Sequence, residues 1–139
     1  MFAQYNISAI LICAVLNMVL GFIWYGLIFS KAFIQLMGIG PDHMSDPASQ
    51  KAAVHGYFAS FFSSILMAVI LSYLIIFSHS TTALEGLKLG LLSWLGFTLT
   101  TMLPNHYFSM KPLKLALINI SYPMVGLSLM GMILAFWRK

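Results

Sequence analysis

The sequence predicts an all-α fold, a four-helix transmembrane bundle, and two observations carry that prediction. The chain of 139 residues is 60% hydrophobic and 7% charged, whereas about a quarter of the residues of an average soluble domain are charged. Its apolar residues gather in four long runs, at 7–29, 54–77, 83–103 and 115–136. Each run reaches the roughly 20 residues that a helix needs to cross a bilayer. We therefore expect a single integral membrane domain over 1–139.

The runs should be helices because a spanning segment has to satisfy its own backbone hydrogen bonds inside lipid. The run at 7–29 is too long for the apolar core of a signal peptide, and no basic residue precedes it, so we expect it to remain as the first span. The third connection should lie between Pro104 and Pro112, because proline cannot continue the hydrogen bonds of a helix.

The connection between the first two runs should carry a short cytoplasmic or interfacial helical extension. Phe33, Leu36 and Met37 follow the first run at helical spacing, and Gly38 can end that helix in a left-handed cap. A turn is expected at 40–42. Asp46 followed by proline is a helix start signal. The second helix should therefore begin ahead of its apolar run and stand about three turns out of the bilayer.

The basic residues indicate the orientation of the chain rather than a nucleic-acid site, because the net charge of +4 is scattered and forms no patch. We expect no nucleic-acid partner. Four lysines lie in the first and third connections, and three basic residues lie at the opposite side: Lys31, Lys51, Lys111 and Lys114 against Lys88, Arg138 and Lys139. Lysine and arginine accumulate on the cytoplasmic side. This balance favours both termini outside.

Small residues recur at every fourth position of the runs. They include Gly21 in the first run, Gly56, Ser60 and Ser64 in the second, and Gly86 and Gly90 in the third. Lipid provides no hydrophobic drive between helices, so close approach at small residues holds a bundle together. We interpret these residues as helix-packing positions. They could face the same chain or a second copy, and the small interior of four helices leads us to expect a homo-oligomer.

Polar and aromatic residues form a layer inside the predicted spans. Its members are Asn17, Trp24, Tyr25, Trp94, Asn119 and Tyr122. Amide and indole N–H groups need partners in lipid, so these side chains should point inward. Pro123 also leaves the backbone carbonyl of Asn119 without its helical partner. Two interpretations stay open: a hydrogen-bonded contact that fixes helix registration, or a binding site for a solute or ion. Trp24 and Tyr25 would also suit an interfacial aromatic belt.

The remaining polar residues do not indicate an enzyme. Asp42 and Asp46 lie in a connection, and Glu85 lies in the first turn of a run, three residues before Lys88. One cysteine and four histidines occur without the spacing of metal ligands. We expect no catalytic residues, no metal and no cofactor.

Three motifs in order along the chain carry a resemblance to a known family. They are Gly21-Phe22-x-Trp24-Tyr25-Gly26, Trp94-Leu95-Gly96-Phe97 and Ile118-Asn119-x-x-Tyr122. The sequence resembles, over nearly its whole length, the small bacterial integral membrane proteins grouped as domain of unknown function 1761. The resemblance implies a four-helix protein of the bacterial cytoplasmic (inner) membrane and brings no activity.

Two functions are therefore expected from different classes. The first is an oligomeric bundle that binds or conducts a small solute or ion at the polar layer. The alternative is a structural or accessory subunit with no transport activity, whose small-residue faces pack against another membrane protein. In both cases the surrounding partner is the lipid bilayer.

Overall fold

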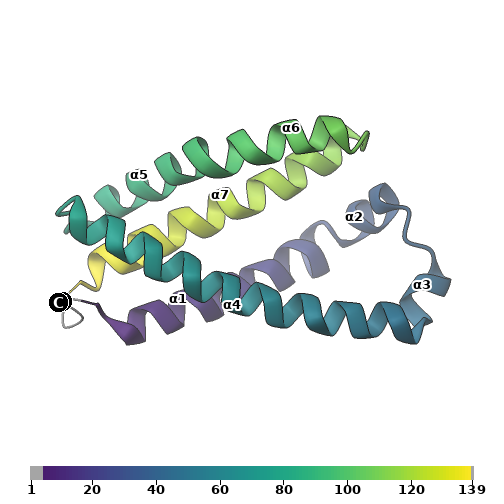
Figure 1. The fold of residues 1–139 in the computed structure, drawn as a ribbon, viewed down its shortest axis with the longest axis horizontal. Helices are drawn as coiled ribbons and strands as arrows, with labels where there is room; N and C mark the ends of the chain where they lie inside the picture. The colour runs from purple at the N-terminus through teal and green to yellow at the C-terminus, as the bar shows by residue number, and fades with distance from the viewer. Residues whose placement is uncertain (1–4, 139) are drawn as a thin grey trace.

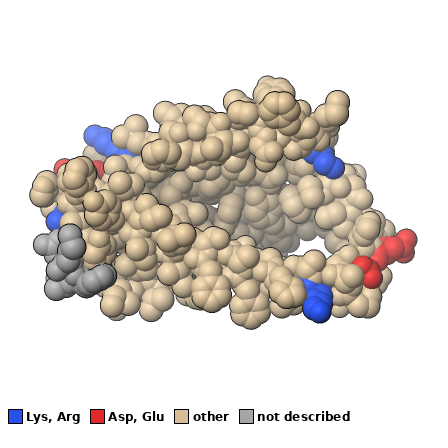
Figure 2. Space-filling view, viewed as in Figure 1, with Lys and Arg blue, Asp and Glu red and all other residues tan. Residues whose placement is uncertain are grey.

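The four spans predicted from the sequence are confirmed in a computed structural model, which describes residues 5–138 (Figure 1). The helical stretches that are long and apolar enough to cross a membrane are Ile7–Ile28, Pro47–Phe77, Ala83–Phe108 and Leu113–Phe136. Charged side chains gather at the two ends of the molecule, and the face between them is uncharged (Figure 2). This distribution suits a chain whose middle lies in hydrocarbon.

The first spanning stretch changes from an α-helix to a π-helix partway along its length. α1 (Ile7–Gly21) begins at Asn6, whose side chain accepts a hydrogen bond from the backbone N–H of Ala9. It continues into the π-helical segment η2 (Phe22–Ile28) and then into α2 (Ser30–Met37). The N–H of Phe29 donates to the carbonyl of Trp24, five residues back, at 2.9 Å. The predicted extension and its cap are confirmed, because α2 ends at Gly38 with a left-handed φ of 69°.

The first connection holds one more short helix. α3 (Pro41–Ser45) occupies the place of the turn expected at 40–42, because proline at a first helical position costs no hydrogen bond. α4 (Pro47–Phe77) then begins as predicted, with Asp46 as N-cap accepting from the N–H of Ser49 at 3.2 Å.

The third stretch is longer than the sequence indicated. α5 (Ala83–Ser93) leads into the π-helical segment η3 (Trp94–Leu99) and α6 (Thr100–Phe108). The expected end at Pro104 was wrong, since this proline lies inside α6. Membrane helices tolerate proline where hydroxyl side chains and π-helical adjustments compensate the backbone. Here Thr100 and Thr101 donate to the carbonyls of Gly96 and Phe97, one turn earlier.

The last helix, α7 (Leu113–Phe136), passes through Pro123 and lies at the centre of the bundle. It packs most extensively against α5 and also contacts α1, α2, α4 and α6. The start of α1, the end of α7 and the α4–α5 turn lie at one end, which we call the terminal end (Figure 1). Lys88 lies in α5 beside this turn, and Arg138 donates a hydrogen bond to the carbonyl of Ser80 in it. Lys139 lies outside the described residues.

The other end holds α2, α3 and the α6–α7 turn, and we call it the lysine end after Lys31, Lys51, Lys111 and Lys114. The buried apolar core lies toward the terminal end, around Ile10, Leu71 and Met130. Toward the lysine end α4 leans away from α7, and every residue from 51 to 60 is exposed. Figure 2 shows the surface hollowed there. The fold is thus closed at one end and open at the other.

Candidate functional site

Two residues of the predicted polar layer connect the first, second and fourth spans. Asn17 is buried, and its amide nitrogen donates to the hydroxyl oxygen of Ser64 at 2.8 Å. The hydroxyl of Tyr122 donates to the backbone carbonyl of Asn17 at 3.0 Å. Two helices are therefore held to α1 at a single residue, close to the middle of the span.

The two tryptophans of the layer attach the π-helical segments to α7. Trp24, in η2, donates from its indole nitrogen to the carbonyl of Ile118 at 3.0 Å. Trp94, in η3, donates to the carbonyl of Ile120 at 2.9 Å. The two accepting carbonyls flank Asn119, whose own carbonyl has no helical donor because of Pro123. Sequence reasoning missed both π-helical segments, which are often found at functional sites.

Tyr25 and Asn119 form the last contact of the layer. The hydroxyl of Tyr25 donates to the side-chain oxygen of Asn119 at 3.1 Å, and the rings of Tyr25 and Tyr122 lie 5.3 Å apart. Within residues 5–138, no buried side-chain nitrogen or oxygen lacks a hydrogen bond. Each residue of the layer therefore makes at least one hydrogen bond within the chain.

Three of the four glycines predicted for packing lie against a neighbouring helix. A Cβ on Gly86 would overlap the carbonyl oxygen of Gly131, and one on Gly90 would overlap that of Leu127. α5 and α7 therefore meet backbone to backbone. A Cβ on Gly21 would stand 3.1 Å from the hydroxyl of Tyr122. These three glycines lie at contacts between helices of this chain.

The positions predicted on α4 behave differently from one another. Ser64 is buried and bonded to Asn17, as described above, and donates to the carbonyl of Ser60 at 2.8 Å. Gly56 and Ser60 are exposed. Nothing lies within 4 Å of a Cβ placed on Gly56. The same four-residue stripe therefore passes from the core into open space along one helix.

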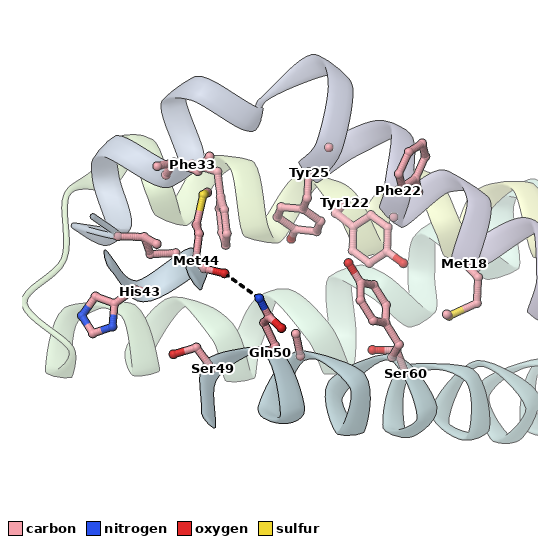
Figure 3. A pocket seen from close by; sticks show the side chains of 16 residues that line it. Met18, Phe22, Tyr25, Phe33, His43, Met44, Ser49, Gln50, Ser60 and Tyr122 are labelled. Carbon is pink, nitrogen blue, oxygen red and sulfur yellow. Dashed lines mark hydrogen bonds between the residues drawn. The ribbon is translucent and has the colours of Figure 1, made fainter. Parts of the chain in front are cut away.

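A cleft of about 660 Å³ lies in that open space, between α1, η2 and α2 on one side and α4 on the other (Figure 3). Its wall is mostly aromatic and aliphatic, with a few uncharged polar groups, and none of the described lining residues is Asp, Glu, Lys or Arg. The lining residues are Met18, Gly21, Phe22, Tyr25, Gly26, Phe33, Ile34, Ile39, His43, Met44, Ser49, Gln50, Ala53, Tyr57, Ser60 and Tyr122.

The polarity of the cleft changes along its length. Met18 and Phe22 lie at the end nearer the bundle centre, and His43, Ser49 and Gln50 lie at the end nearer α3 (Figure 3). The amide nitrogen of Gln50 donates to the carbonyl of Met44 at 3.2 Å, which ties α4 to α3. The cleft therefore runs from a hydrocarbon-like region to a polar mouth at the lysine end.

The two tyrosines in the wall can act toward the cleft only as acceptors. A phenol has one proton to donate. Tyr25 gives its proton to Asn119, and Tyr122 gives its proton to Asn17. Their oxygens retain lone pairs, so a molecule in the cleft would have to bring an O–H or N–H group to bond with them.

Sequence reasoning predicted Tyr25 and Tyr122 but missed His43, Gln50 and Tyr57 as neighbours of the same cavity. No local pattern marks these residues, because the cavity arises from the lean of α4 and not from a motif. A usable signal was the start of α4 far ahead of its apolar run, which places uncharged polar side chains beside the end of the first span.

Comparison with known proteins identifies the family and nothing beyond it. A family model described as "Protein of unknown function (DUF1761)" matches residues 8–135. No curated protein and no solved structure matches the chain.

Proposed function

For this chain, which belongs to the DUF1761 family of proteins of unknown function, we propose binding of a small uncharged amphipathic molecule in the cleft between α1–η2–α2 and α4. The single observation that supports this function is the cleft itself, about 660 Å³ with a graded and uncharged lining. Ligand sites are commonly about 300–1,000 Å³, mostly apolar, with a few placed polar groups. The protein is a multi-pass membrane protein, so its ligand can enter from the bilayer.

The chemistry of the lining narrows the ligand. An apolar body would lie against Met18 and Phe22, and a polar group would lie near Ser49 and Gln50. A hydroxyl or amide N–H would bond to the oxygens of the two tyrosines, which have already donated their protons. An ionised ligand is disfavoured, because no carboxylate, lysine or arginine among the described lining residues would offset its desolvation.

Binding is better supported than conduction of a solute or ion. A conducting path needs polar groups that are free to replace water, whereas Asn17, Trp24 and Trp94 are bonded within the bundle. Tyr122 lines the cleft, but Asn17, Trp24 and Trp94 do not. In this proposal the lysine end faces the cytoplasm of a bacterial cell, according to the distribution of lysines.

The test is to fill the cleft. Ala53 lines it, and Ala52 is exposed on the same helix outside it. Wild-type protein, Ala53→Phe and Ala52→Phe are purified from membranes in mild detergent, and co-purified small molecules are extracted and identified by mass spectrometry. We expect one neutral molecule to be depleted about tenfold or more in Ala53→Phe, since each ~1.4 kcal/mol of lost contact lowers affinity tenfold.

The control variant Ala52→Phe shows whether the depletion is specific to the cleft. Ala52→Phe adds the same ring to the same turn of α4 and should retain the molecule at the wild-type level. If all three proteins carry the same molecules in the same amounts, the cleft binds none of them and the proposal is rejected.

A second function, an accessory or self-associating membrane subunit, is favoured by the exposure of residues 51–60 and by the open space at Gly56. Here a second copy or another membrane protein would cover this half of α4. The protein is reconstituted in lipid nanodiscs and its copies are counted by mass photometry. More than one copy per disc, at protein concentrations where discs outnumber chains, is expected for self-association. A single copy per disc would contradict self-association.

A further inference from the structure

A second cavity lies at the lysine end and shares no lining residue with the cleft. It measures about 270 Å³ and lies between the end of α2, α6 and the start of α7. Its polar lining residues are Asn105, His106, Ser109, Lys111 and Asn119. A single ordered water needs only about 10–15 Å³ of such volume, so the cavity accommodates a group of several heavy atoms.

We propose that this cavity binds an oxyanion, a phosphate or a carboxylate. Among the residues that the structure describes, Lys111 is the one lysine, arginine or carboxylate in its lining. The chain has three acidic residues, Asp42, Asp46 and Glu85, and none of them lines the cavity. The positive charge therefore has no carboxylate counterpart within the site, and an anion supplies one.

The uncharged groups of the cavity favour the same ligand. Tyr25 donates to the side-chain oxygen of Asn119, which leaves the amide nitrogen of Asn119 to donate. The amide of Asn105 and the ring of His106 add further donors. Ser109 is different: its hydroxyl donates to the carbonyl of Asn105 at 2.6 Å. An oxyanion accepts several hydrogen bonds at once, and charge-assisted bonds are about twice as strong as neutral ones.

The position of the cavity adds a favourable field. Leu115 and Ala116, in the first turn of the 24-residue helix α7, line it. The amino-terminal end of a helix carries partial positive charge, which favours an anion within about the first turn. The cavity also opens at the lysine end, where the headgroups of anionic lipids would lie. The phosphate can thus belong to a lipid headgroup or to a free anion.

The two sources are separated by two arms of one experiment. In the first arm the protein is placed in phosphatidylcholine nanodiscs and inorganic phosphate is titrated, with the thermal unfolding temperature as readout. In the second arm the discs contain a small fraction of phosphatidylglycerol, and native mass spectrometry counts the phosphatidylglycerol molecules that remain bound. A shift in the first arm identifies a free anion, and retention in the second arm alone identifies a lipid headgroup.

Matched variants test whether the cavity is responsible. Lys111→Gln should weaken binding about tenfold, as expected for loss of a hydrogen bond to a charged group. Lys114 lies three residues away at the same end but outside the cavity, so Lys114→Gln should remain within about twofold of wild type. Lys111 lies in an exposed connection, so its replacement should leave the fold intact.

Asn119→Asp provides a second variant. It keeps an oxygen to accept from Tyr25 and replaces the donating amide by an anionic oxygen, so anion binding should be abolished. The proposal is overturned if Lys111→Gln and Lys114→Gln behave alike, or if neither phosphate nor phosphatidylglycerol binds to the wild-type protein.

Discussion

At the terminal end of the bundle α5 and α7 lie in backbone contact, whereas at the lysine end α4 leans away from its neighbours. Both ends contain glycine at the positions where close approach was expected. Gly86 meets the backbone of Gly131, and a Cβ on Gly131 would in turn overlap the carbonyl oxygen of Gly86. Gly56 meets nothing. A glycine therefore permits close approach but does not by itself bring a second helix against it.

The terminal end has further contacts that the lysine end lacks. The guanidinium of Arg138 donates to the carbonyls of Ile75 and Ser80, at 3.5 and 3.3 Å. The side chain of Asn6 donates to the carbonyl of Trp137 at 3.0 Å. These bonds tie α7 to the α4–α5 turn and to the start of α1. The terminal end is thus closed by these bonds, and the two cavities described above lie toward the lysine end.

The largest expected effect comes from a methyl group at the α5–α7 contact. Gly86→Ala should destabilise the protein by about 1–3 kcal/mol, because the new Cβ would overlap backbone atoms that cannot move aside by rotamer change. Gly56→Ala places the same methyl in open space on α4 and should be neutral or stabilising by up to about 1 kcal/mol, the usual helical advantage of alanine over glycine. Thermal unfolding in the same detergent measures both.

Equal unfolding temperatures for the two variants would break the comparison between the ends. That result would mean that α5 and α7 can separate without cost, and the backbone contact would not be what closes the terminal end.

The number and type of the spans could be predicted because they depend on local composition alone. Any helix of about 20 apolar residues satisfies its backbone in lipid, so the four runs were sufficient. The starts and caps were also local: Asp46 bonds to the N–H of Ser49, and Gly38 takes the left-handed conformation that the absence of a side chain allows. Such features need no knowledge of the neighbouring helices.

The failures are places where one helix depends on another. Pro104 did not end the third span, because hydroxyl groups and the π-helical segment before it adjust the backbone. Trp24 and Trp94 were recognised as polar groups in need of partners, but not as the residues that fix π-helical segments to α7. The sequence shows that a buried N–H donor requires an acceptor, whereas the packing of the helices determines which carbonyl accepts the hydrogen bond.

The candidate site shows the same limit. Asn17, Tyr25 and Tyr122 were identified from their chemistry, and the structure gives each a partner. The cleft beside them depends on the angle between α4 and the neighbouring helices. No single residue of α4 determines that angle. Two glycines of α7 were missed as packing positions. Gly131 packs against α5 and Gly126 packs against the side chain of Asn17, but their spacing of five residues does not form a four-residue stripe.

The smallest expected effect concerns the hydrogen bond at the boundary between the closed and open ends. Tyr122→Phe removes the bond to the carbonyl of Asn17 and should cost about 0.6 kcal/mol, the mean for side-chain hydrogen bonds measured in a membrane protein. Tyr73→Phe, on an exposed ring of α4, should leave the unfolding temperature unchanged.

The size of the Tyr122→Phe effect also tests the interpretation that the polar layer fixes helix registration. The carbonyl of Asn17 keeps its place in α1 when the tyrosine hydroxyl is lost, so a contact that only fixes registration gives a small and local loss. A loss of more than about 1.7 kcal/mol, the upper end for such bonds, that also exceeds the loss in Gly86→Ala would show that the contact of α1 with α7 at Tyr122 stabilises the fold more than the glycine contacts of α5 with α7. The boundary, and not the terminal end, would then be the region on which the fold depends.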